Sequence, residues 1–309
     1  MKINVGILGF GNLGKAVAHE LINDARFNLV AVFTHRKSLT NEEQNKVNNV
    51  KLENINNIGK YKRKIKIMFL CGGSSSTLQK DARLALKYFN TIDAFDTHAK
   101  IKKYIKSCDK LAKTNKKVAF CSIGWDPGLF SGMRVLFNSL DEKTYTIWGK
   151  GVSQGHSEAI RRIEGVKDAV QYTVPNKGLI NKLKLGELTD GKLHKRECLV
   201  VADKKDQKRI ENEIKNMPNY FLGYNTKVSF VSQDEILQHK ALFHRGEVFT
   251  LGNNFNFSLK TNSNPSLTSK IMLSYAIAML EYIKNKRYGA YSILDIPFAQ
   301  LLKNSDRFI

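Results

Sequence analysis

The first 125 residues alternate between short apolar runs and amphipathic stretches. The apolar runs, rich in β-branched side chains, are typical of buried strands, whereas the amphipathic stretches repeat their apolar residues at helical spacing. Strand and helix in regular alternation predict an α/β fold with a doubly wound parallel sheet. The strand candidates are INVGIL, LVAVF, IKIMFLC, TIDAF and KVAFCS, and the helix candidates are LGKAVAHELIN, TLQKDARLALKYF and IKKYIKSCDKLAK.

Beyond residue 125 the pattern changes to amphipathic strand candidates, with one charged helix candidate, KKDQKRIENEIKNM, among them. This pattern is typical of an α+β domain with a mixed or antiparallel sheet. A long amphipathic helix is predicted at residues 266–286, where apolar residues recur at helical spacing. Those residues are Leu267, Ile271, Tyr275, Met279 and Ile283.

The change of pattern predicts two domains, which also suits a chain of 309 residues. We expect a first domain over residues 1–125 and a second over residues 126–265. The helical segment 266–309 can pack back on the first domain and would then belong to it. No repeat or low-complexity linker marks the boundary.

Composition narrows the class of protein. A hydrophobic fraction of 42% with 25% charged residues is typical of a soluble globular protein. No uncharged apolar run reaches the roughly 18 residues of a membrane span, and the start MKINVGILGFG enters a strand candidate directly, so we expect a cytoplasmic protein. The four cysteines show no spacing typical of a metal site or a disulfide framework, so we expect reduced thiols and no metal.

The net charge of +22 and the pI near 9.7 raise nucleic-acid binding as an alternative. The lysines are spread along the whole chain, and even the densest run, KYKRKIK, has no aromatic-interleaved basic motif around it. We therefore interpret the charge as a solvated surface that aids solubility, and we expect no nucleic-acid partner.

A glycine-rich loop, GFGNLG at residues 9–14, stands between the first strand candidate and the first helix candidate. Its three glycines permit a tight turn, close approach of the backbone to a pyrophosphate, and tight packing of helix on strand. The N-terminus of the following helix would stabilise the anion. In this strand–turn–helix context, the loop predicts a Rossmann-type dinucleotide-binding domain rather than a structural turn.

The end of the second strand candidate indicates which dinucleotide binds. An NAD enzyme usually has an acidic residue there for the ribose hydroxyls, but this chain has hydroxyl and cationic groups, which favour the 2′-phosphate of NADP. The alternative is that the cations are ordinary exposed residues of a lysine-rich chain. The residues are Thr34, His35, Arg36 and Lys37.

Two carboxylates follow later strand candidates, where the carboxyl ends of parallel strands carry ligands. Asp96 lies in FDTH after TIDAF, and Asp126 lies in SIGWDPG after KVAFC. Either could bind an ammonium group, and either could instead cap the helix that follows. The small residues of CGGSSST, at residues 71–77, would lie beside the same cofactor.

The loop WGKGVSQGHS, at residues 148–157, resembles a phosphate cradle but has no strand–GxGxxG–helix context. We therefore expect it to offer backbone N–H groups to a carboxylate of a small substrate, close to a helix that begins near Ser157.

The motifs together resemble those of meso-diaminopimelate dehydrogenases, over nearly the whole chain. GFGNLG, DTH, GWDPG, WGKGVSQGHSEAIRRI, VQYTVP, HKRECLVVAD, ENEIKNMPNYFLGY and NSNP occur in the family's order and at similar spacing. The resemblance implies a homodimer that catalyses the reversible NADP-dependent oxidative deamination of the D-centre of meso-2,6-diaminopimelate. The products would be L-2-amino-6-oxopimelate and ammonia, in the biosynthesis of diaminopimelate and lysine. The second domain would then bind substrate and form the dimer.

The resemblance also implies roles for individual residues, with Asp96 and Asp126 at the reacting D-centre. Residues that would contact NADP are Phe10, Gly11, Asn12, Leu13, Thr34, His35, Arg36, Lys37, Cys71, Gly72, Gly73, Ser74, Ala94, Phe95, Asp96, Ile123, Gly124, Trp125, Asp126 and Pro127. Further substrate contacts would be Trp148, Gln154, Gly155, His156, Ser157, Glu158 and Ala159, and the distal L-centre would be held by Thr173, Arg196, His244 and Asn264.

From the residues alone, the distal set has plainer interpretations. Arg196 stands in a basic run that is usual on a solvated face, His244 could be an exposed loop residue, and Asn264 before Pro265 is a typical turn residue. The stretch HKALFHRGEV departs from the more glycine-rich stretch expected in the family, and Thr34 and His35 stand where the family often has Ser and Arg.

Two rival functions remain open from the sequence. One is another NADP-dependent reductase of similar build, such as a dihydrodipicolinate reductase or a D-amino-acid dehydrogenase of broader scope. The other is a basic nucleic-acid-binding protein. A third possibility, a cofactor-binding regulator without turnover, would have been suggested by loss of Asp96 and Asp126, but both are present.

Overall fold

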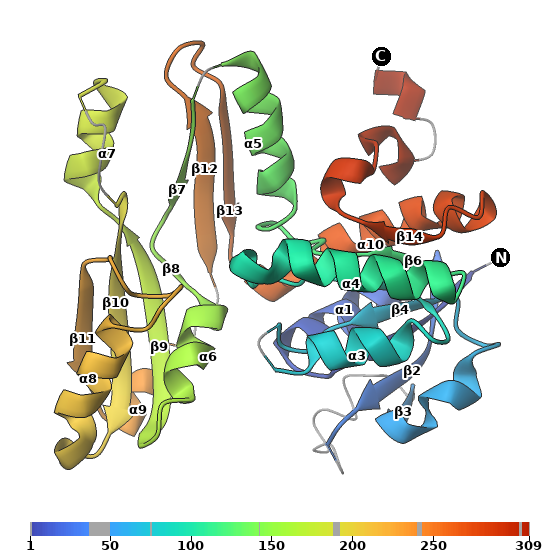
Figure 1. Ribbon diagram of the computed structural model, residues 1–309, viewed down its shortest axis with the longest axis horizontal. Helices are drawn as coiled ribbons and strands as arrows, with labels where there is room; N and C mark the ends of the chain where they lie inside the picture. Colours follow the sequence, from blue (N-terminus) through green and yellow to red (C-terminus); the bar gives the residue numbers. More distant parts are fainter. Residues whose placement is uncertain are drawn as a thin grey trace. The chain divides into compact units, whose positions relative to one another are not determined.

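The computed structural model describes residues 2–36, 50–74, 76–141, 143–187, 192–239, 243–302 and 305–308. It divides into two compact units (Figure 1). Unit 1 comprises Met1–Gly132 and Pro265–Ile309, and unit 2 comprises Met133–Asn264. No helix among the described residues is long and apolar enough to cross a membrane.

Unit 1 is built on a seven-stranded sheet in which every pair of neighbours is parallel. The strand order is β14-β6-β5-β4-β1-β2-β3. The order reverses direction between β1 and β4, so the doubly wound α/β prediction is confirmed. The strands are β1 (Ile3–Leu8), β2 (Phe27–Thr34), β3 (Lys51–Asn54), β4 (Ile67–Leu70), β5 (Asn90–Asp93), β6 (Val118–Phe120) and β14 (Gly289–Tyr291).

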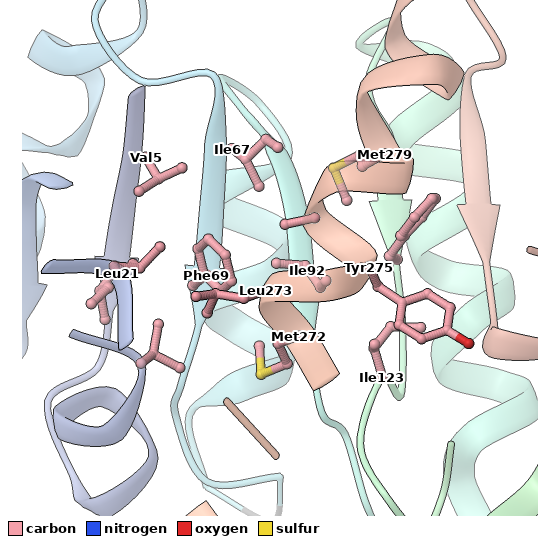
Figure 2. Close-up of a cluster of buried hydrophobic side chains, with 14 of the residues drawn as sticks. Val5, Leu21, Ile67, Phe69, Ile92, Ile123, Met272, Leu273, Tyr275 and Met279 are labelled. Carbon is pink, nitrogen blue, oxygen red and sulfur yellow. The ribbon is translucent and has the colours of Figure 1, made fainter. Parts of the chain in front are cut away.

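One face of this sheet is covered by α1 (Asn12–Asn23) and α10 (Asn264–Lys284). Successive strand residues point to opposite faces, so Val5 and Ile7 of β1 pack on these two helices. Figure 2 shows Leu21 of α1 near Val5 and Met272 of α10 below Phe69 and Leu273. Full burial of a side chain of this size stabilises the fold by about 2 kcal/mol.

The other face is covered by α3 (Leu78–Ala85) and α4 (Ile101–Thr114). Leu8 and Leu70 point to this face and pack in the same cluster as Ala82 of α3 and Cys108 of α4. In a sheet covered by helices on both faces, ligands bind at the carboxyl ends of the strands, and this arrangement positions a nucleotide.

Unit 2 contains a four-stranded sheet of order β11-β10-β9-β8 and a three-stranded antiparallel sheet of order β13-β12-β7. The four-stranded sheet is mixed, because β10 pairs parallel with β11 and antiparallel with β9. The predicted α+β pattern is therefore confirmed. The strands are β7 (Thr144–Trp148), β8 (Gly151–Val152), β9 (Val166–Pro175), β10 (His194–Ala202), β11 (Thr226–Phe230), β12 (His244–Thr250) and β13 (Asn256–Thr261).

Helices cover both faces of the four-stranded sheet as well. Ile160 of α6 and Ile210 of α8 pack with Cys198 and Val200 on one face, whereas Ile236 of α9 packs on the other. The helices associated with unit 2 are α5 (Leu129–Leu140, which begins in unit 1), α6 (Gln154–Arg161), α7 (Lys177–Lys184), α8 (Gln207–Lys215) and α9 (Gln233–Leu237).

Several elements were not predicted from the sequence. β3 and β14 are edge strands of three or four residues, too short for a period of two to stand out, and α7 is only two turns long. Short 3₁₀ turns add Ile55–Tyr61, His98–Lys100, Lys204–Asp206, Ile293–Asp295, Phe298–Leu301 and Ser305–Phe308.

Candidate active site

The glycine-rich loop lies at the carboxyl end of β1, where the strand order reverses. Gly9 has a φ of +99°, and a Cβ on Gly14 would lie 2.1 Å from the Gly9 carbonyl oxygen, so both positions require glycine. A Cβ on Gly11, in contrast, would meet nothing within 4 Å. α1 begins next to this open space with no side-chain cap on its N–H groups. The residues therefore fit a pyrophosphate held by backbone N–H groups.

The strand β4 ends beside the same loop. The N–H of Cys71 donates to the Leu8 carbonyl (2.7 Å), and a Cβ on Gly9 would lie 2.9 Å from the Gly72 nitrogen. Burial raises the pKa of the Cys71 thiol well above its ordinary value, so Cys71 packs as a neutral side chain. The small residues Gly72, Gly73 and Ser74 follow it in the sequence.

The end of β2 brings the Arg36 guanidinium to this edge. The Arg36 guanidinium donates to the Phe10 carbonyl (2.9 Å), and the Arg36 N–H donates to Thr34 Oγ1 (3.1 Å). A guanidinium anchored on the glycine-rich loop fits the 2′-phosphate of NADP. His35 lies 2.8 Å from Asp81 Oδ1 of α3, a contact that sequence reasoning missed. Lys37 lies outside the described residues.

Asp93, at the end of β5, holds two predicted site loops in place. Its fully buried carboxylate accepts hydrogen bonds from the N–H groups of Phe95 (2.9 Å) and Ser122 (3.0 Å), and from the Tyr104 hydroxyl (2.7 Å). Burial raises the pKa of Asp93, against these hydrogen bonds, which lower it. Sequence reasoning missed this residue, although a carboxylate inside the apolar run TIDAF is an anomaly that could have drawn attention to it.

Asp96 extends from the loop that Asp93 holds. Its side chain is exposed, and its N–H donates to Ser74 Oγ (3.0 Å), which joins the loops after β5 and β4. The following helical turns begin after Thr97 and Lys100, so Asp96 caps neither of them. Its carboxylate is placed at the carboxyl edge of the sheet, with Ala94 and Phe95 before it.

Asp126 lies in the turn that follows β6. The Gly124 N–H donates to the Pro127 carbonyl (3.1 Å), and Gly128 has a φ of +136°, so the backbone doubles back around Asp126. Trp125 is buried edge-on against Phe130, with ring centroids 5.3 Å apart. The Asp126 side chain is half-buried, and Ile123 is held by its N–H bond to the Asp93 carbonyl (2.7 Å).

Three residues on neighbouring strands of the four-stranded sheet lie in one row, and two of them, Thr173 and Arg196, are predicted site residues. Gly151 of β8 pairs with Thr173 of β9, which pairs with Arg196 of β10. Residues paired across neighbouring strands point to the same face. The row therefore places a hydroxyl and a guanidinium side by side, with Gly151 next to them.

Arg196 is buried, with 9% of its surface exposed, and its contacts are unusual for a buried cation. Its Nη1 donates to Thr173 Oγ1 (2.6 Å), its guanidinium lies 4.2 Å from the centre of the Tyr224 ring, and its Nε has no hydrogen-bond partner among the described residues. No carboxylate of the described chain forms an ion pair with it. Burial lowers the pKa of Arg196, but an arginine stays charged near neutral pH, so its guanidinium has the chemistry to bind an anion.

Two buried or half-buried histidines lie close to this row. His244 packs on Gly151, where a Cβ would lie 2.8 Å from its Nδ1, and burial lowers the pKa of His244 to about 4. His194 accepts a hydrogen bond from the Trp148 N–H (2.7 Å), and burial, with the Arg196 charge second, lowers the pKa of His194 to about 4. Both rings are neutral near pH 7, so they act as hydrogen-bonding groups. Sequence reasoning identified His244 but missed His194 and Tyr224.

The loop WGKGVSQGHS runs from the end of β7 through β8 into α6, which begins at Gln154, earlier than the expected start near Ser157. Ser157 is buried: its hydroxyl donates to the Ser153 carbonyl (2.7 Å) and accepts from the Gln171 N–H (2.9 Å). His156 Nδ1 lies 2.7 Å from Ser153 Oγ. These two residues therefore shape the loop, whereas the buried Nε2 of Gln154 has no hydrogen-bond partner among the described residues.

The remaining predicted residues lie nearby in sequence or at the end of unit 2. Glu158 forms ion pairs with Arg161 (3.3 Å) and Arg162 (3.5 Å), which accounts for its carboxylate, and Gly155 and Ala159 are half-buried in α6. Asn264 is half-buried at the first position of α10. Within the described residues, no group of three His, Cys, Asp or Glu side chains could hold a metal ion.

Comparisons with known proteins cover the whole chain. Residues 124–264 match a family model described as the diaminopimelic acid dehydrogenase C-terminal domain. A meso-diaminopimelate D-dehydrogenase of Ureibacillus thermosphaericus is 43% identical over 98% of this chain and 97% of its own. The solved C. glutamicum DAP dehydrogenase in complex with DAP is similar with a TM-score of 0.91, at 33% identity over 99% of this chain and 98% of that one. An engineered D-amino acid dehydrogenase bound to NADP+ is similar with a TM-score of 0.89, at 32% identity over 100% and 98% of the two chains.

The glycine-rich loop at the carboxyl edge of the sheet, with Arg36 beside it, fits a nucleotide. Together with these similarities, the site identifies an NADP-dependent oxidoreductase that acts on a CH–NH2 group. Its relatives match along both units, and several exceed 30% identity over almost the full length. The chain belongs to the meso-diaminopimelate D-dehydrogenase family.

Proposed function

We propose that the protein catalyses the reversible NADP-dependent oxidative deamination of the D-centre of meso-2,6-diaminopimelate. The products are L-2-amino-6-oxopimelate, which cyclises to tetrahydrodipicolinate, and ammonia. The observation that carries the proposal is Arg196, a buried guanidinium without a carboxylate partner among the described residues. A substrate with a carboxylate at its non-reacting end supplies that partner.

NADP would bind at the carboxyl edge of the sheet in unit 1. The open space at Gly11 fits the pyrophosphate, and Arg36 with His35 suits the 2′-phosphate. When bound, NADP accepts the hydride, and the protein supplies orientation and a dry environment. The remaining contacts that the family resemblance implies among the described residues, from Phe10 to Pro127, lie at or shortly after the carboxyl ends of β1, β2, β4, β5 and β6.

At the reacting end, Asp96 and Asp126 would bind the ammonium group of the D-centre. Once a proton has left that group, the C–H bond breaks with its electron pair as hydride, and an iminium remains. Water adds to the iminium carbon. The C–N bond then breaks as the added oxygen becomes the ketone oxygen, and the nitrogen leaves as ammonium, which is ammonia with a proton. A carboxylate within hydrogen-bond reach of the attacking water accepts its proton, and either Asp96 or Asp126 has this chemistry.

At the other end, the substrate's L-centre would be held in unit 2. Arg196 can form a two-point bond with the distal carboxylate, Thr173 and the neutral His244 add hydrogen-bonding groups, and Asn264 adds an amide. The loop residues Trp148 and Gln154 would contact the substrate between the two ends. Fixing the L-centre presents the D-centre to the hydride acceptor, and such positioning can contribute several kcal/mol.

A D-amino-acid dehydrogenase of broad scope is the second candidate function. Simple D-amino acids have no distal carboxylate, and binding them would leave Arg196 buried and uncompensated, which is costly. A buried guanidinium with no carboxylate partner among the described residues therefore favours a substrate with two carboxylates.

The setting of this activity follows from the same family resemblance. We place the reaction in diaminopimelate and lysine biosynthesis in the cytoplasm, with a homodimer as the working form. Residues 1–125 would serve as the dinucleotide-binding domain, joined by 266–309, and residues 126–265 would bind substrate and form the dimer.

The direct test supplies NADP and one stereoisomer of diaminopimelate at a time and follows the absorbance of NADPH. We expect reduction with the meso isomer, little with the DD isomer and none with the LL isomer. Asp126→Ala should abolish NADPH formation while the thermal unfolding midpoint and NADP binding persist. Asp203→Ala, which removes an exposed carboxylate paired with Lys167, is the matched control and should retain full activity. Folded protein that forms no NADPH with any isomer would refute the proposal.

A further inference from the structure

A buried carboxylate of α3 lies against two loops of the proposed cofactor site, those that follow β2 and β4. Asp81 is only 1% exposed, and its Oδ1 lies 2.8 Å from Nε2 of His35, at the end of β2. On its other side, a Cβ on Gly72 would lie 2.9 Å from Asp81 Oδ2. The carboxylate thus touches the loop after β2 and the loop after β4, which the sequence separates by more than thirty residues.

The position of Asp81 in the helix suits a charged carboxylate. It lies in the first turn of α3, where its N–H donates to the Thr77 carbonyl (3.0 Å). The partial positive charge of a helix N-terminus favours an anion there. Its Oδ2 has no hydrogen-bond partner among the described residues, so the contact with His35 is the principal compensation for its burial.

His35 is more exposed than Asp81, so His35 is the member of the pair that can contact a bound cofactor. The His35 side chain is 46% exposed, and it precedes Arg36, whose guanidinium is anchored on the Phe10 carbonyl. A ring that donates Nε2–H to a carboxylate has Nδ1 left for one further partner, and the protonated ring donates from that atom. An anionic oxygen beside Arg36 is the partner with matching chemistry.

We propose that Asp81 is a positioning residue for cofactor selectivity: it orients His35 so that the imidazole binds the 2′-phosphate of NADP together with Arg36. The inference rests on the cofactor site proposed above. Asp81 does not touch the phosphate, and acts through the imidazole alone.

The test measures binding of NADP and of NAD separately, by isothermal titration, without any amino-acid substrate. Asp81→Asn should weaken NADP binding roughly tenfold, the loss of one charge-assisted contact, and change NAD binding less than about twofold. In a His35→Ala background, Asp81→Asn should cause no further weakening, because the residue through which it acts is gone. Asp24→Asn, which removes a carboxylate paired with Arg26 near the opposite strand ends, should leave both affinities unchanged.

Three results would overturn the inference: equal weakening of NADP and NAD binding, the same weakening with and without His35, or no weakening. If Asp81→Asn does not fold, His35→Asn removes the same contact from the exposed side and must reproduce the selective loss of NADP affinity; failure to do so also overturns it. Because no diaminopimelate is present, the outcome is independent of whether the proposed turnover is correct.

Discussion

At the scale of residues, the proposed choice of substrate rests on single side chains of unit 2. Arg196 holds the only positive charge in the row formed with Gly151 and Thr173, because the neighbouring His194 and His244 are neutral near pH 7. A single fixed charge with neutral hydrogen-bonding groups around it matches one carboxylate. Burial disfavours the protonated form of both histidines in the folded state, so the free energy of unfolding depends on pH.

The lowered pKa of His244 predicts a pH dependence of stability. The unfolded state, with an ordinary pKa near 6.5, binds a proton that the folded state refuses until about pH 4. The contribution is therefore fully present above about pH 6.5 and is lost as the pH falls toward 4. Removing the titrating group with His244→Gln should reduce the loss of unfolding free energy between pH 7.5 and 4.5 by about 2 kcal/mol.

Urea unfolding of the wild type and His244→Gln at the two pH values measures this difference. His19→Gln, at an exposed position of α1, serves as the control and should keep the wild-type pH dependence. Identical pH dependence in wild type and His244→Gln would contradict a neutral, buried His244.

At the scale of elements, the loop between β1 and α1 contains one glycine that the packing of the fold requires and another that it does not. A Cβ on Gly14 would collide with the Gly9 carbonyl oxygen at 2.1 Å, whereas a Cβ on Gly11 would point into open space. The two glycines stand in the same motif, yet only one of them is required by packing.

This contrast predicts opposite effects of two alanine substitutions. Gly14→Ala should lower the unfolding free energy by about 2–3 kcal/mol, because α1 must move away from β1. Gly11→Ala should leave stability within about 0.5 kcal/mol but weaken NADP binding, since its methyl group occupies the space into which the pyrophosphate fits. Chemical unfolding and cofactor titration of both variants check the prediction, and tight NADP binding by Gly11→Ala would contradict the assignment of this loop.

Elements were predictable from the sequence where their periodicity was long and uninterrupted. The apolar runs of β1, β2 and β4 and the spacing in α10 indicated the parallel sheet and its covering helices. Short edge strands such as β3 and β14 carry too few residues to show a period. Within the candidate site, motif residues could be predicted, and the position of Asp93 inside an apolar run was a signal that sequence reasoning missed. Asp81 and Tyr224 could not be predicted, because their roles depend on contacts between residues far apart in the sequence.

At the scale of the whole molecule, positive charge is unevenly distributed. Unit 1 contains 29 of the 50 lysines and arginines but only 13 of the 28 aspartates and glutamates. Cations gather at the amino ends of its strands, around a cavity of about 560 Å³ lined by Lys2, Lys62, Arg63, Lys64, Lys66 and Lys117. Like charges at this density repel one another and destabilise the compact state.

Screening of this repulsion should stabilise the protein. Raising sodium chloride from 20 to 300 mM shortens the Debye length, so we expect the thermal unfolding midpoint to rise by roughly 2–5 °C. Differential scanning calorimetry of the protein without cofactor measures the change. A midpoint that falls with salt would contradict the interpretation of the charge as a repulsive solvated surface.

The central claim is that Arg196 recognises a distal carboxylate of the substrate. The most direct measurement compares kcat/KM of wild type and Arg196→Met for two substrates, meso-diaminopimelate and a D-amino acid of similar length without a distal carboxylate. Loss of a buried charged pair predicts a fall of at least about a hundredfold for meso-diaminopimelate and almost no fall for the other substrate. Equal losses for both substrates, or none for meso-diaminopimelate, would contradict the account.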